Sequence, residues 1–369
     1  LDVVPAGDGW QTPPFTPTRD GDRIYGRGTS DDKGPVIASL LAMKAIRDAG
    51  IPLKRKIRLI LGCDEESNWE DMAYYTAHAD MPRIGFSPDA SFPVINTEKG
   101  MLHFQLKAEA AKTGLQVKHW MTGERVNVIP GHAEMLLEGG EALAEQVRAY
   151  AKETGLPYTA EVTAEGVKVT AEGIPGHSAY PEGRRNAIGM MLCLLLRLGV
   201  EGPLKTIAEA VGMEHDGASL GCACADKVSG PLTCNMGIMR VENGQIFCTL
   251  DDRCPVEADQ EKLIAATRAH LPGVQVEVIE QKAPHHVPAE SELVSSLLAA
   301  YHEETGLPAE ACSTGGGTYA KVLEQGVAFG ASFPDDEDLA HQANEYATIS
   351  GLMKSMRIYA NALVRLAGE

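Results

Sequence analysis

The amino-acid sequence predicts an α/β protein with a mixed, largely parallel sheet and helices on both faces, interrupted by an inserted α+β domain. Three observations predict this fold. Strand and helix patterns alternate along the first hundred residues, closely spaced strand patterns dominate residues 104–287, and the alternation returns from residue 288. We therefore expect a first domain built from residues 1–103 and 288–369 and a second domain built from residues 104–287. A chain of 369 residues is long enough for two hydrophobic cores.

The first hundred residues contain one clear helix pattern and two strand patterns. Residues 35–49 place apolar side chains at helical spacing, and Gly50 is a typical residue after a helix. Residues 57–63 are apolar and rich in branched side chains, which predicts a buried strand, and residues 84–86 predict another. Acidic residues follow both strands, and sites in open α/β sheets form at the carboxyl ends of strands.

The inserted domain is predicted to consist of two similar β-α-β-β halves. The first half has a strand over 125–130, a helix near 138–152 and strands near 162 and over 167–169; the second has a strand over 252–256, a helix near 259–270 and a strand over 274–278. The patterns of the last part are a helix near 291–305, a glycine-rich turn at 315–317, a strand over 327–331 and a helix over about 348–366.

Composition excludes several classes of protein. The formal net charge is −18, which would repel nucleic acid and anionic lipid surfaces. Hydrophobic residues make up 44% of the chain, yet no apolar run reaches the roughly 18 residues that a membrane helix needs, so we expect a soluble protein. The eight cysteines lack the spacing of a disulfide scaffold, and no leader pattern precedes the first residues. We expect reduced thiols and a cytoplasmic protein.

Acidic residues recur where predicted strands end or helices begin: Asp31 and Asp32, Glu65 and Glu66, and Asp89. One acidic pair is usually a solvated turn, but repetition at successive strand ends indicates a site for divalent cations. His341 lies in an acidic loop and could complete a histidine and carboxylate set suited to zinc, cobalt or manganese. A carboxylate beside a ligand, such as Glu65, could take the proton of a metal-activated water.

Five dispersed motifs carry a specific resemblance. They are LDVVP at 1–5, YGRGTSDDKG at 25–34, DEES at 64–67, FSPDA at 86–90 and AHQANE at 340–345. In this order they resemble the motifs of the co-catalytic zinc family that includes acetylornithine deacetylase, succinyl-diaminopimelate desuccinylase, carboxypeptidase G and carnosinase. GDGW at 7–10, SPDA at 87–90 and GGGTY at 315–319 are most similar to the peptidase V type dipeptidases of bacteria within that family.

The resemblance implies a role for each residue of a two-metal site. Asp31 would bridge two divalent ions, zinc in this family, with cobalt and manganese as alternatives. Asp89 would complete the ligand set of one ion, and Glu66 and His341 would complete that of the other. Glu65 would act as general base and acid. Asp2 resembles the carboxylate that orients a first histidine ligand, which the family motif places immediately before Leu1. The peptide bond between Asp31 and Asp32 is expected to be cis.

The resemblance also implies substrate-binding residues. His177 is similar to the family's lid histidine, which polarises the scissile carbonyl, and Asn127 and Arg253 are similar to lid residues that grip substrate. Arg253 would pair with the substrate carboxylate, although an ordinary surface ion pair is an open alternative. Backbone N–H groups of the turn that contains Gly316, Gly317 and Thr318 could bind a carboxylate as well.

These features predict a metallo-dipeptidase that hydrolyses the peptide bond of dipeptides with free amino and carboxyl ends. Two alternatives stay open: an N-acyl amino-acid deacylase or desuccinylase of the same family, and a non-enzymatic binding protein that lacks one metal. A nucleotide enzyme is disfavoured because the sequence has no Gly-x-x-x-x-Gly-Lys loop. Since a doubled lid can imitate a partner subunit, we expect a monomer whose partner is a small peptide substrate.

Overall fold

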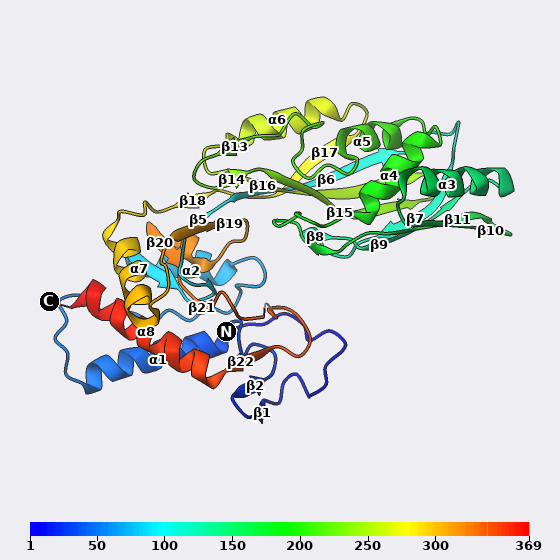
Figure 1. The fold of residues 1–369 in the computed structure, drawn as a ribbon. Coiled ribbons are helices and arrows are strands. Elements are labelled where there is room, and N and C mark those ends of the chain that lie inside the picture. The colour runs from blue at the N-terminus through cyan, green and yellow to red at the C-terminus, as the bar shows by residue number, and fades with distance from the viewer. Residues whose placement is uncertain (338, 369) are drawn as a thin grey trace. The chain divides into compact units, whose positions relative to one another are not determined.

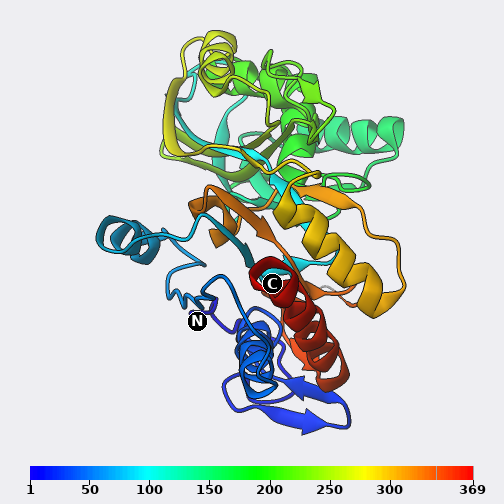
Figure 2. The ribbon, with the colours of Figure 1, turned by 90° about the vertical axis from the view of Figure 1, so that its left-hand side faces the viewer.

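The computed structural model describes residues 1–337 and 339–368, and these residues form two compact units. Unit 1 comprises Leu1–Glu98 and His285–Glu369, and unit 2 comprises Lys99–Pro284. Figure 1 shows both units as ribbons, and Figure 2 shows them turned by 90°. The chain leaves unit 1 after β5 (Val94–Glu98) and returns to it at β18 (His285–His286), which are antiparallel neighbours.

Unit 1 has a mixed five-stranded sheet, as the sequence predicts. Its order is β18, β5, β20 (Gln325–Ala328) and β3 (Ile84–Ser87), with β19 (Ala311–Thr314) paired to β5. The β20–β3 and β19–β5 pairs are parallel, whereas β18 and β20 run antiparallel to β5. Two small sheets join β1 (Thr18–Asp20), β2 (Arg23–Tyr25) and β22 (Tyr346–Thr348), and β21 (Ala331–Ser332) with β4 (Ala90–Ser91).

The helices of unit 1 are α1 (Lys33–Asp48), α2 (Glu70–His78), α7 (Glu292–Thr305) and α8 (Ile349–Ala367), with a 3-10 turn at Tyr319–Val322. The predicted helices at 35–49, 291–305 and 348–366 are confirmed. Helix α8 packs against α1 and α7 (Figure 2). The core that they share with the sheet is aromatic: the rings of Phe92, Phe329 and Tyr359 lie within 6.0 Å of one another. Packing of these buried rings fixes the end of the sheet near Asp89.

The predicted strand over residues 57–63 is wrong. In the described structure this segment is extended but forms no ladder hydrogen bonds, and Leu61 is 51% exposed. Among the described strands, β3 pairs with β20 along one edge only. Apolar branched residues indicate that their side chains are sheltered from water, but they do not show that the backbone pairs with another strand. Here Ile57 and Leu59 line a cavity beside β3, and their backbone joins no sheet.

Unit 2 is built on an eight-stranded sheet with one large apolar core. Its strands, in order across the sheet, are β10 (Tyr158–Thr163), β11 (Gly166–Glu172), β9 (His132–Leu137), β7 (Val117–Thr122), β15 (Thr233–Glu242), β16 (Gln245–Cys254), β6 (Gly100–Glu109) and β17 (Gln275–Lys282). Its helices are α3 (Glu141–Thr154), α4 (Ala187–Arg197), α5 (Pro203–Val211) and α6 (Gln260–His270).

The predicted helices near 138–152 and 259–270 are confirmed as α3 and α6. Each is followed by a strand at one outer end of the sheet, β10 after α3 and β17 after α6. The strand expected over 125–130 is reduced to β8 (Val128–Ile129), which pairs with β12 (Gly176–His177). Two further short strands, β13 (Ala225–Asp226) and β14 (Gly230–Pro231), form a hairpin.

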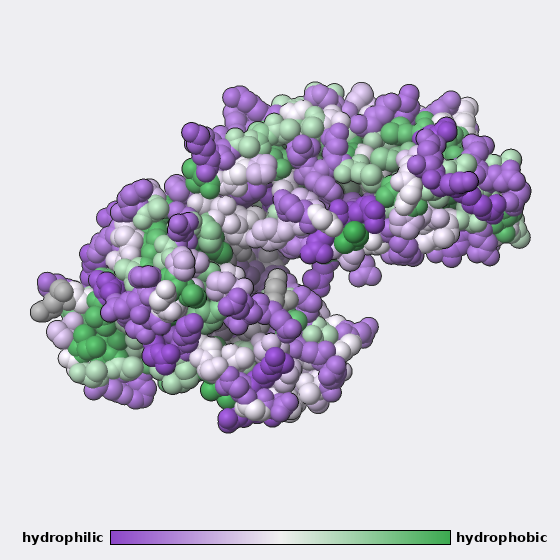
Figure 3. Space-filling view, in the orientation of Figure 1, coloured by the Kyte–Doolittle hydropathy of each residue, from purple (hydrophilic) through white to green (hydrophobic). Residues whose placement is uncertain are grey.

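The face of the molecule drawn in Figure 3 is mostly polar, with apolar residues in small groups. This agrees with a chain in which 23% of residues are charged. Among the helices of the described residues, none combines the length and the apolar character that crossing a membrane requires.

Candidate metal centre and substrate-binding residues

Three predicted metal ligands from distant parts of the sequence meet in unit 1. Asp31 lies just before helix α1, Glu66 follows the extended segment, and His341 lies in the loop before β22. The Nε2 atom of His341 is 3.1 Å from Asp31 Oδ2 and 3.0 Å from Glu66 Oε2. Ligand atoms of the three side chains all lie within 4.8 Å of one another. The fold therefore gathers a nitrogen and two carboxylates into one cluster.

Asp89 extends this cluster on the other side of Asp31. It lies two residues after the end of β3 and shares a hydrogen bond with Asp31. Burial, together with the nearby charges of Asp31 and Glu65, raises the pKa of Asp89 well above its ordinary value. Asp31 thus contacts both His341 and Asp89, as a carboxylate shared by two ions would have to. The peptide bond between Asp31 and Asp32 is cis, as expected from the resemblance.

The electrostatics of the cluster fit divalent cations. Hydrogen bonds to Asp31 and Glu66 raise the pKa of His341 to about 10, against the opposing effect of burial. Burial alone would raise the pKa of Asp31, but the hydrogen bond and charge of His341 outweigh it and lower that pKa. A proton on His341 therefore stabilises carboxylates that a metal ion would otherwise stabilise. One imidazole nitrogen with several carboxylate oxygens is a donor set suited to zinc, cobalt and manganese.

Glu65 and Glu66 are held in place by Asp2. The two carboxylate oxygens of Asp2 accept hydrogen bonds from the backbone N–H of Glu65, at 3.2 Å, and of Glu66, at 3.1 Å. Trp69 donates its indole N–H to the carbonyl of Glu65 at 2.8 Å. These contacts fix the backbone of both glutamates. Asp2, predicted to orient a histidine, orients the turn that presents Glu65 and Glu66.

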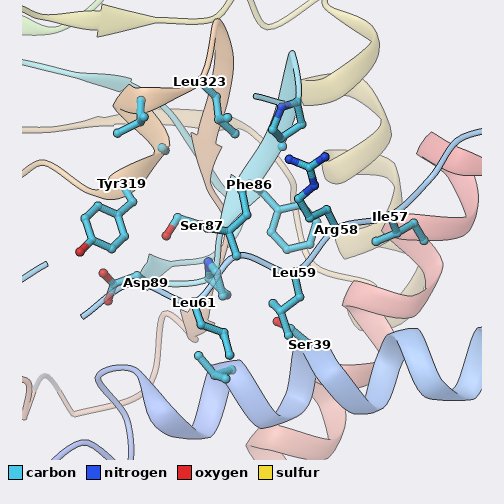
Figure 4. Close-up of a pocket in the computed structure, with 18 of the residues that line it drawn as sticks. Ser39, Ile57, Arg58, Leu59, Leu61, Phe86, Ser87, Asp89, Tyr319 and Leu323 are labelled. Carbon is cyan, nitrogen blue, oxygen red and sulfur yellow. The ribbon is translucent and has the colours of Figure 1, made fainter. Parts of the chain in front are cut away.

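A cavity of about 440 Å³ opens beside this turn, wholly within unit 1 (Figure 4). Glu65 and Asp89 contribute to its acidic end, and the rest is largely apolar. Figure 4 shows Leu59 between the strand that carries Phe86 and helix α1, which carries Ser39. The acidic residues thus border a low-dielectric space, where charges interact more strongly than in water.

The glycine-rich turn is arranged differently from the prediction. The N–H and hydroxyl of Thr318 donate to the buried carboxylate of Glu98 at 3.1 and 2.8 Å, and the N–H of Gly316 donates to Thr314 Oγ1 at 3.0 Å. The N–H groups of Gly316 and Thr318 are therefore engaged within the protein. Among the hydrogen bonds of the described residues, none comes from the N–H of Gly317. Sequence reasoning missed Glu98 because a glutamate at the end of a strand has no distinguishing pattern.

The predicted lid residues His177 and Asn127 lie on adjacent segments of unit 2. His177 is exposed in β12, and the next residue, Ser178, donates its N–H to the carbonyl of Asn127 at 3.0 Å. The buried hydroxyl of Ser178 donates to Asp251 Oδ2 at 2.5 Å. Asp251 in turn holds Arg253, so hydrogen bonds through Ser178 and Asp251 link Asn127 to Arg253, and His177 precedes Ser178 in the sequence.

Arg253 is buried, with 6% of its surface exposed, rather than part of the surface ion pair considered as an alternative. Its Nε and Nη2 atoms donate to the two oxygens of Asp251 at 2.8 and 2.9 Å. Asp251 is fully buried and also contacts His103 Nε2 at 3.2 Å, while His103 Nδ1 lies 2.7 Å from Glu280. Burial opposes ionisation of Asp251, but Arg253 and His103 outweigh it and lower its pKa. Asp251 was not among the predicted site residues.

The charge on His103 predicts a loss of stability at alkaline pH. Burial by itself lowers the pKa of His103, but hydrogen bonds to Asp251 and Glu280 outweigh it and raise that pKa from 6.5 to about 8. This stabilisation is complete below pH 6.5 and is lost as the pH rises through 8. The shift corresponds to roughly 2 kcal/mol. We expect urea unfolding followed by Trp120 fluorescence, with Trp10 and Trp69 replaced by Phe, to show this loss between pH 6 and 9.5.

The control is His103→Gln in the same background, which cannot carry the charge. Between pH 6 and 9.5, the loss of unfolding free energy should be smaller for this variant than for the protein with His103, and the difference should be about 2 kcal/mol. Parallel pH profiles for the two proteins would show that His103 is not the group responsible.

The chain is similar to known proteins over nearly its whole length. The family model described as "Peptidase family M20/M25/M40" matches residues 1–365. "Putative dipeptidase YtjP" of Bacillus subtilis (strain 168) is 35% identical over 379 residues, covering 100% of this chain and 81% of the relative. "Putative dipeptidase SAR1836" of Staphylococcus aureus (strain MRSA252) is 34% identical over 385 residues, covering 100% and 82%.

Solved structures show the same fold at low sequence identity. Aminopeptidase PepT from Bacillus cereus ATCC 10987 aligns with a TM-score of 0.59 at 14% identity, over 99% of this chain and 78% of that one. Human carnosine dipeptidase 1 aligns with a TM-score of 0.55, also at 14% identity, over 99% and 78%. The family match covers nearly the whole chain, so the chain belongs to peptidase family M20/M25/M40 and is a peptide hydrolase of that family.

Proposed function

We propose that this peptidase is a two-metal dipeptidase that cleaves dipeptides with free amino and carboxyl ends. The observation that carries the proposal is that Asp31 contacts both His341 and Asp89. A shared carboxylate between two half-sites is what a pair of ions requires. The relatives named as dipeptidases support the substrate class.

In the proposed site, Asp31 would be shared by the two ions, Glu66 and His341 would hold one of them, and Asp89 would hold the other. Zinc fits this donor set, as do cobalt and manganese. When bound, the metal pair supplies Lewis acidity, which lowers the pKa of a water molecule and polarises the peptide carbonyl. The remaining steps fall to side chains of the chain itself.

Glu65 is the proposed proton carrier. Its backbone is fixed by Asp2, and its side chain belongs to the acidic end of the cavity beside Asp89. It would take the proton from the attacking water and deliver it to the leaving nitrogen, so that this nitrogen departs as a neutral amine and not as an anion. His177 would donate a hydrogen bond to the carbonyl oxygen as negative charge develops there.

Substrate recognition is proposed to read both charged ends of the dipeptide. Arg253 would pair with the C-terminal carboxylate and Asn127 would hydrogen-bond the substrate, while Gly316, Gly317 and Thr318 form a second candidate carboxylate site. Because Glu98 already accepts from Thr318, Gly317 is the donor of that turn that the proposal favours. Because the amino end and the carboxylate would be bound at fixed places, only a peptide of the matching length would fit.

A substrate panel tests this function against the deacylase alternative. Purified protein loaded with zinc, cobalt or manganese should hydrolyse free dipeptides at least tenfold faster, by kcat/KM, than N-acetyl or N-succinyl amino acids. Metal content measured by inductively coupled plasma mass spectrometry should approach two ions per chain. A reversed preference would assign the chain to the deacylases, and absence of hydrolysis with fewer than two ions would assign it to binding proteins.

We also propose that the protein is monomeric and cytoplasmic. All eight cysteines are free thiols in the structure, which suits a reducing compartment. The similarity between the two ends of the unit 2 sheet supports the proposal of a monomer, because each end has a helix followed by an outer strand. Light scattering of the purified chain at micromolar concentration checks it.

A further inference from the structure

Glu345 is a buried carboxylate to which the proposed chemistry gives no role. It lies four residues after His341, and its side chain is fully buried. Its Oε1 atom accepts hydrogen bonds from the N–H of Ser30 at 2.9 Å, the hydroxyl of Ser30 at 3.1 Å and the N–H of Asp31 at 3.2 Å. Its Oε2 atom accepts from Gly28 N–H at 3.0 Å and Arg27 Nη1 at 2.7 Å.

These contacts give one carboxylate five donors, three of which are backbone N–H groups of the turn that ends at Asp31. The backbone carbonyl of Glu345 also accepts from the N–H of Gly26 at 3.0 Å. Hydrogen bonds to an ionised acceptor in a buried setting are stronger than those between neutral groups, and the geometry of the turn is therefore tightly fixed. The position of the Asp31 carboxylate follows from that geometry.

Glu345 belongs to the same loop as His341, and this loop is anchored independently. Asn344 accepts a hydrogen bond from Gln11 N–H at 2.7 Å and donates to the carbonyl of Gly9 at 3.2 Å. His341 and Asn344 both have positive φ, at 63° and 62°, a backbone conformation that needs such support. The contacts of Glu345 thus tie the turn that carries Asp31 to the loop that carries His341.

The charge of Glu345 is neutralised locally. Arg27 forms a buried ion pair with it, with side-chain exposures of 2% and 0%, and also donates to the carbonyl of Ala6 at 3.1 Å. Because Arg27 balances the carboxylate, Glu345 contributes little net charge to the metal centre. Its effect on that centre must come through the backbone that it holds.

We propose that Glu345 is a positioning residue that sets metal affinity by fixing the distance between Asp31 and His341. The proposal rests on the two-metal function proposed above and deepens it. A glutamine at this position keeps one oxygen acceptor but turns an amide NH₂ group toward N–H donors, and it leaves Arg27 without its counter-charge. The two ligand segments then lose the contact that sets their separation.

The test is metal affinity rather than turnover. Metal-free protein is titrated with zinc against a chromophoric chelator, for the wild-type chain and for Glu345→Gln. We expect the variant to bind at least one of the two ions tenfold or more weakly, with an unchanged far-ultraviolet circular dichroism spectrum. The matched control is Glu98→Gln, which alters another buried glutamate that accepts one backbone N–H and one hydroxyl from Thr318 and, among the described contacts, touches none of the proposed metal ligands. Its zinc affinity should stay within twofold of the wild type.

If Glu345→Gln fails to fold, a second variant tests the same role of Glu345. Glu345→Asp retains the charge but is one methylene shorter, so it cannot reach both Gly28 and Ser30 from the same backbone position. Weaker zinc binding by this variant supports positioning, whereas wild-type affinity would overturn it, since charge alone would then suffice. Equal affinities of wild type and Glu345→Gln would overturn this inference alone, while a wild-type chain that binds no zinc would overturn the two-metal function with it.

Discussion

Glu65→Gln is expected to lower kcat for dipeptide hydrolysis by roughly 10²- to 10⁴-fold, the range that positioned proton transfer contributes. The amide is nearly isosteric with the carboxylate but cannot accept a proton. The backbone N–H of residue 65 still donates to Asp2, so the turn that carries Glu66 keeps its geometry. The loss should therefore fall on kcat while KM changes little. Steady-state kinetics with a free dipeptide at saturating metal measure both constants.

Two comparisons separate proton transfer from metal loss. Glu66→Gln changes the adjacent residue, whose carboxylate contacts His341, and should lower the number of bound ions, whereas Glu65→Gln should keep them. Glu70→Gln alters an exposed glutamate at the start of α2 and should leave both kinetics and metal content unchanged. Full activity of Glu65→Gln, with its metal content intact, would show that another group carries the proton.

The metal cluster was open to prediction from sequence because its residues lie in short motifs at the ends of predicted elements. Asp31 precedes a helix and Asp89 follows a strand, and both patterns are local. His341 was a candidate ligand from its acidic loop, but only the resemblance gave it a place in a metal site, since a loop histidine has no pattern of its own. The structure then brings it to 3.1 Å from Asp31, across about three hundred residues of sequence.

The contacts that hold these residues could not be predicted. Glu345 and Asp2 act on backbone N–H groups, which every residue except proline possesses, so sequence does not reveal which of them a carboxylate will reach. The extended segment at 57–63 shows the same limit for secondary structure. Its apolar residues indicate a sheltered environment, but ladder pairing depends on a neighbouring strand that the segment itself does not encode.

Unit 2 illustrates how burial changes the meaning of a residue. From sequence, Arg253 after two aspartates fitted either substrate binding or a surface ion pair. The structure buries it against Asp251 and links Asp251 to Ser178, beside His177. A buried guanidinium that a carboxylate holds in one orientation would lose little further freedom on pairing with a substrate carboxylate, as the proposed function requires.

Arg253→Ala is accordingly expected to lower kcat/KM for free dipeptides by about 10²-fold or more, which corresponds to roughly 3 kcal/mol for a buried, hydrogen-bonded charge pair. For dipeptide amides, which have no terminal carboxylate, the loss should be less than about fivefold. Arg253→Lys keeps the charge but not the two-edged geometry, so its loss with free dipeptides should be intermediate.

The difference between the two substrates is the decisive quantity, because removing Arg253 also leaves Asp251 with only His103 and Ser178 as described partners. Any general disturbance of unit 2 lowers turnover of both substrates alike, whereas loss of carboxylate recognition lowers only that of the free dipeptide. Asp251→Asn provides the matched comparison: it removes the charge that orients Arg253 while keeping the arginine, and should show the same selectivity in weaker form. Equal losses for free dipeptides and their amides in Arg253→Ala would remove Arg253 from the substrate site and leave it a structural partner of Asp251.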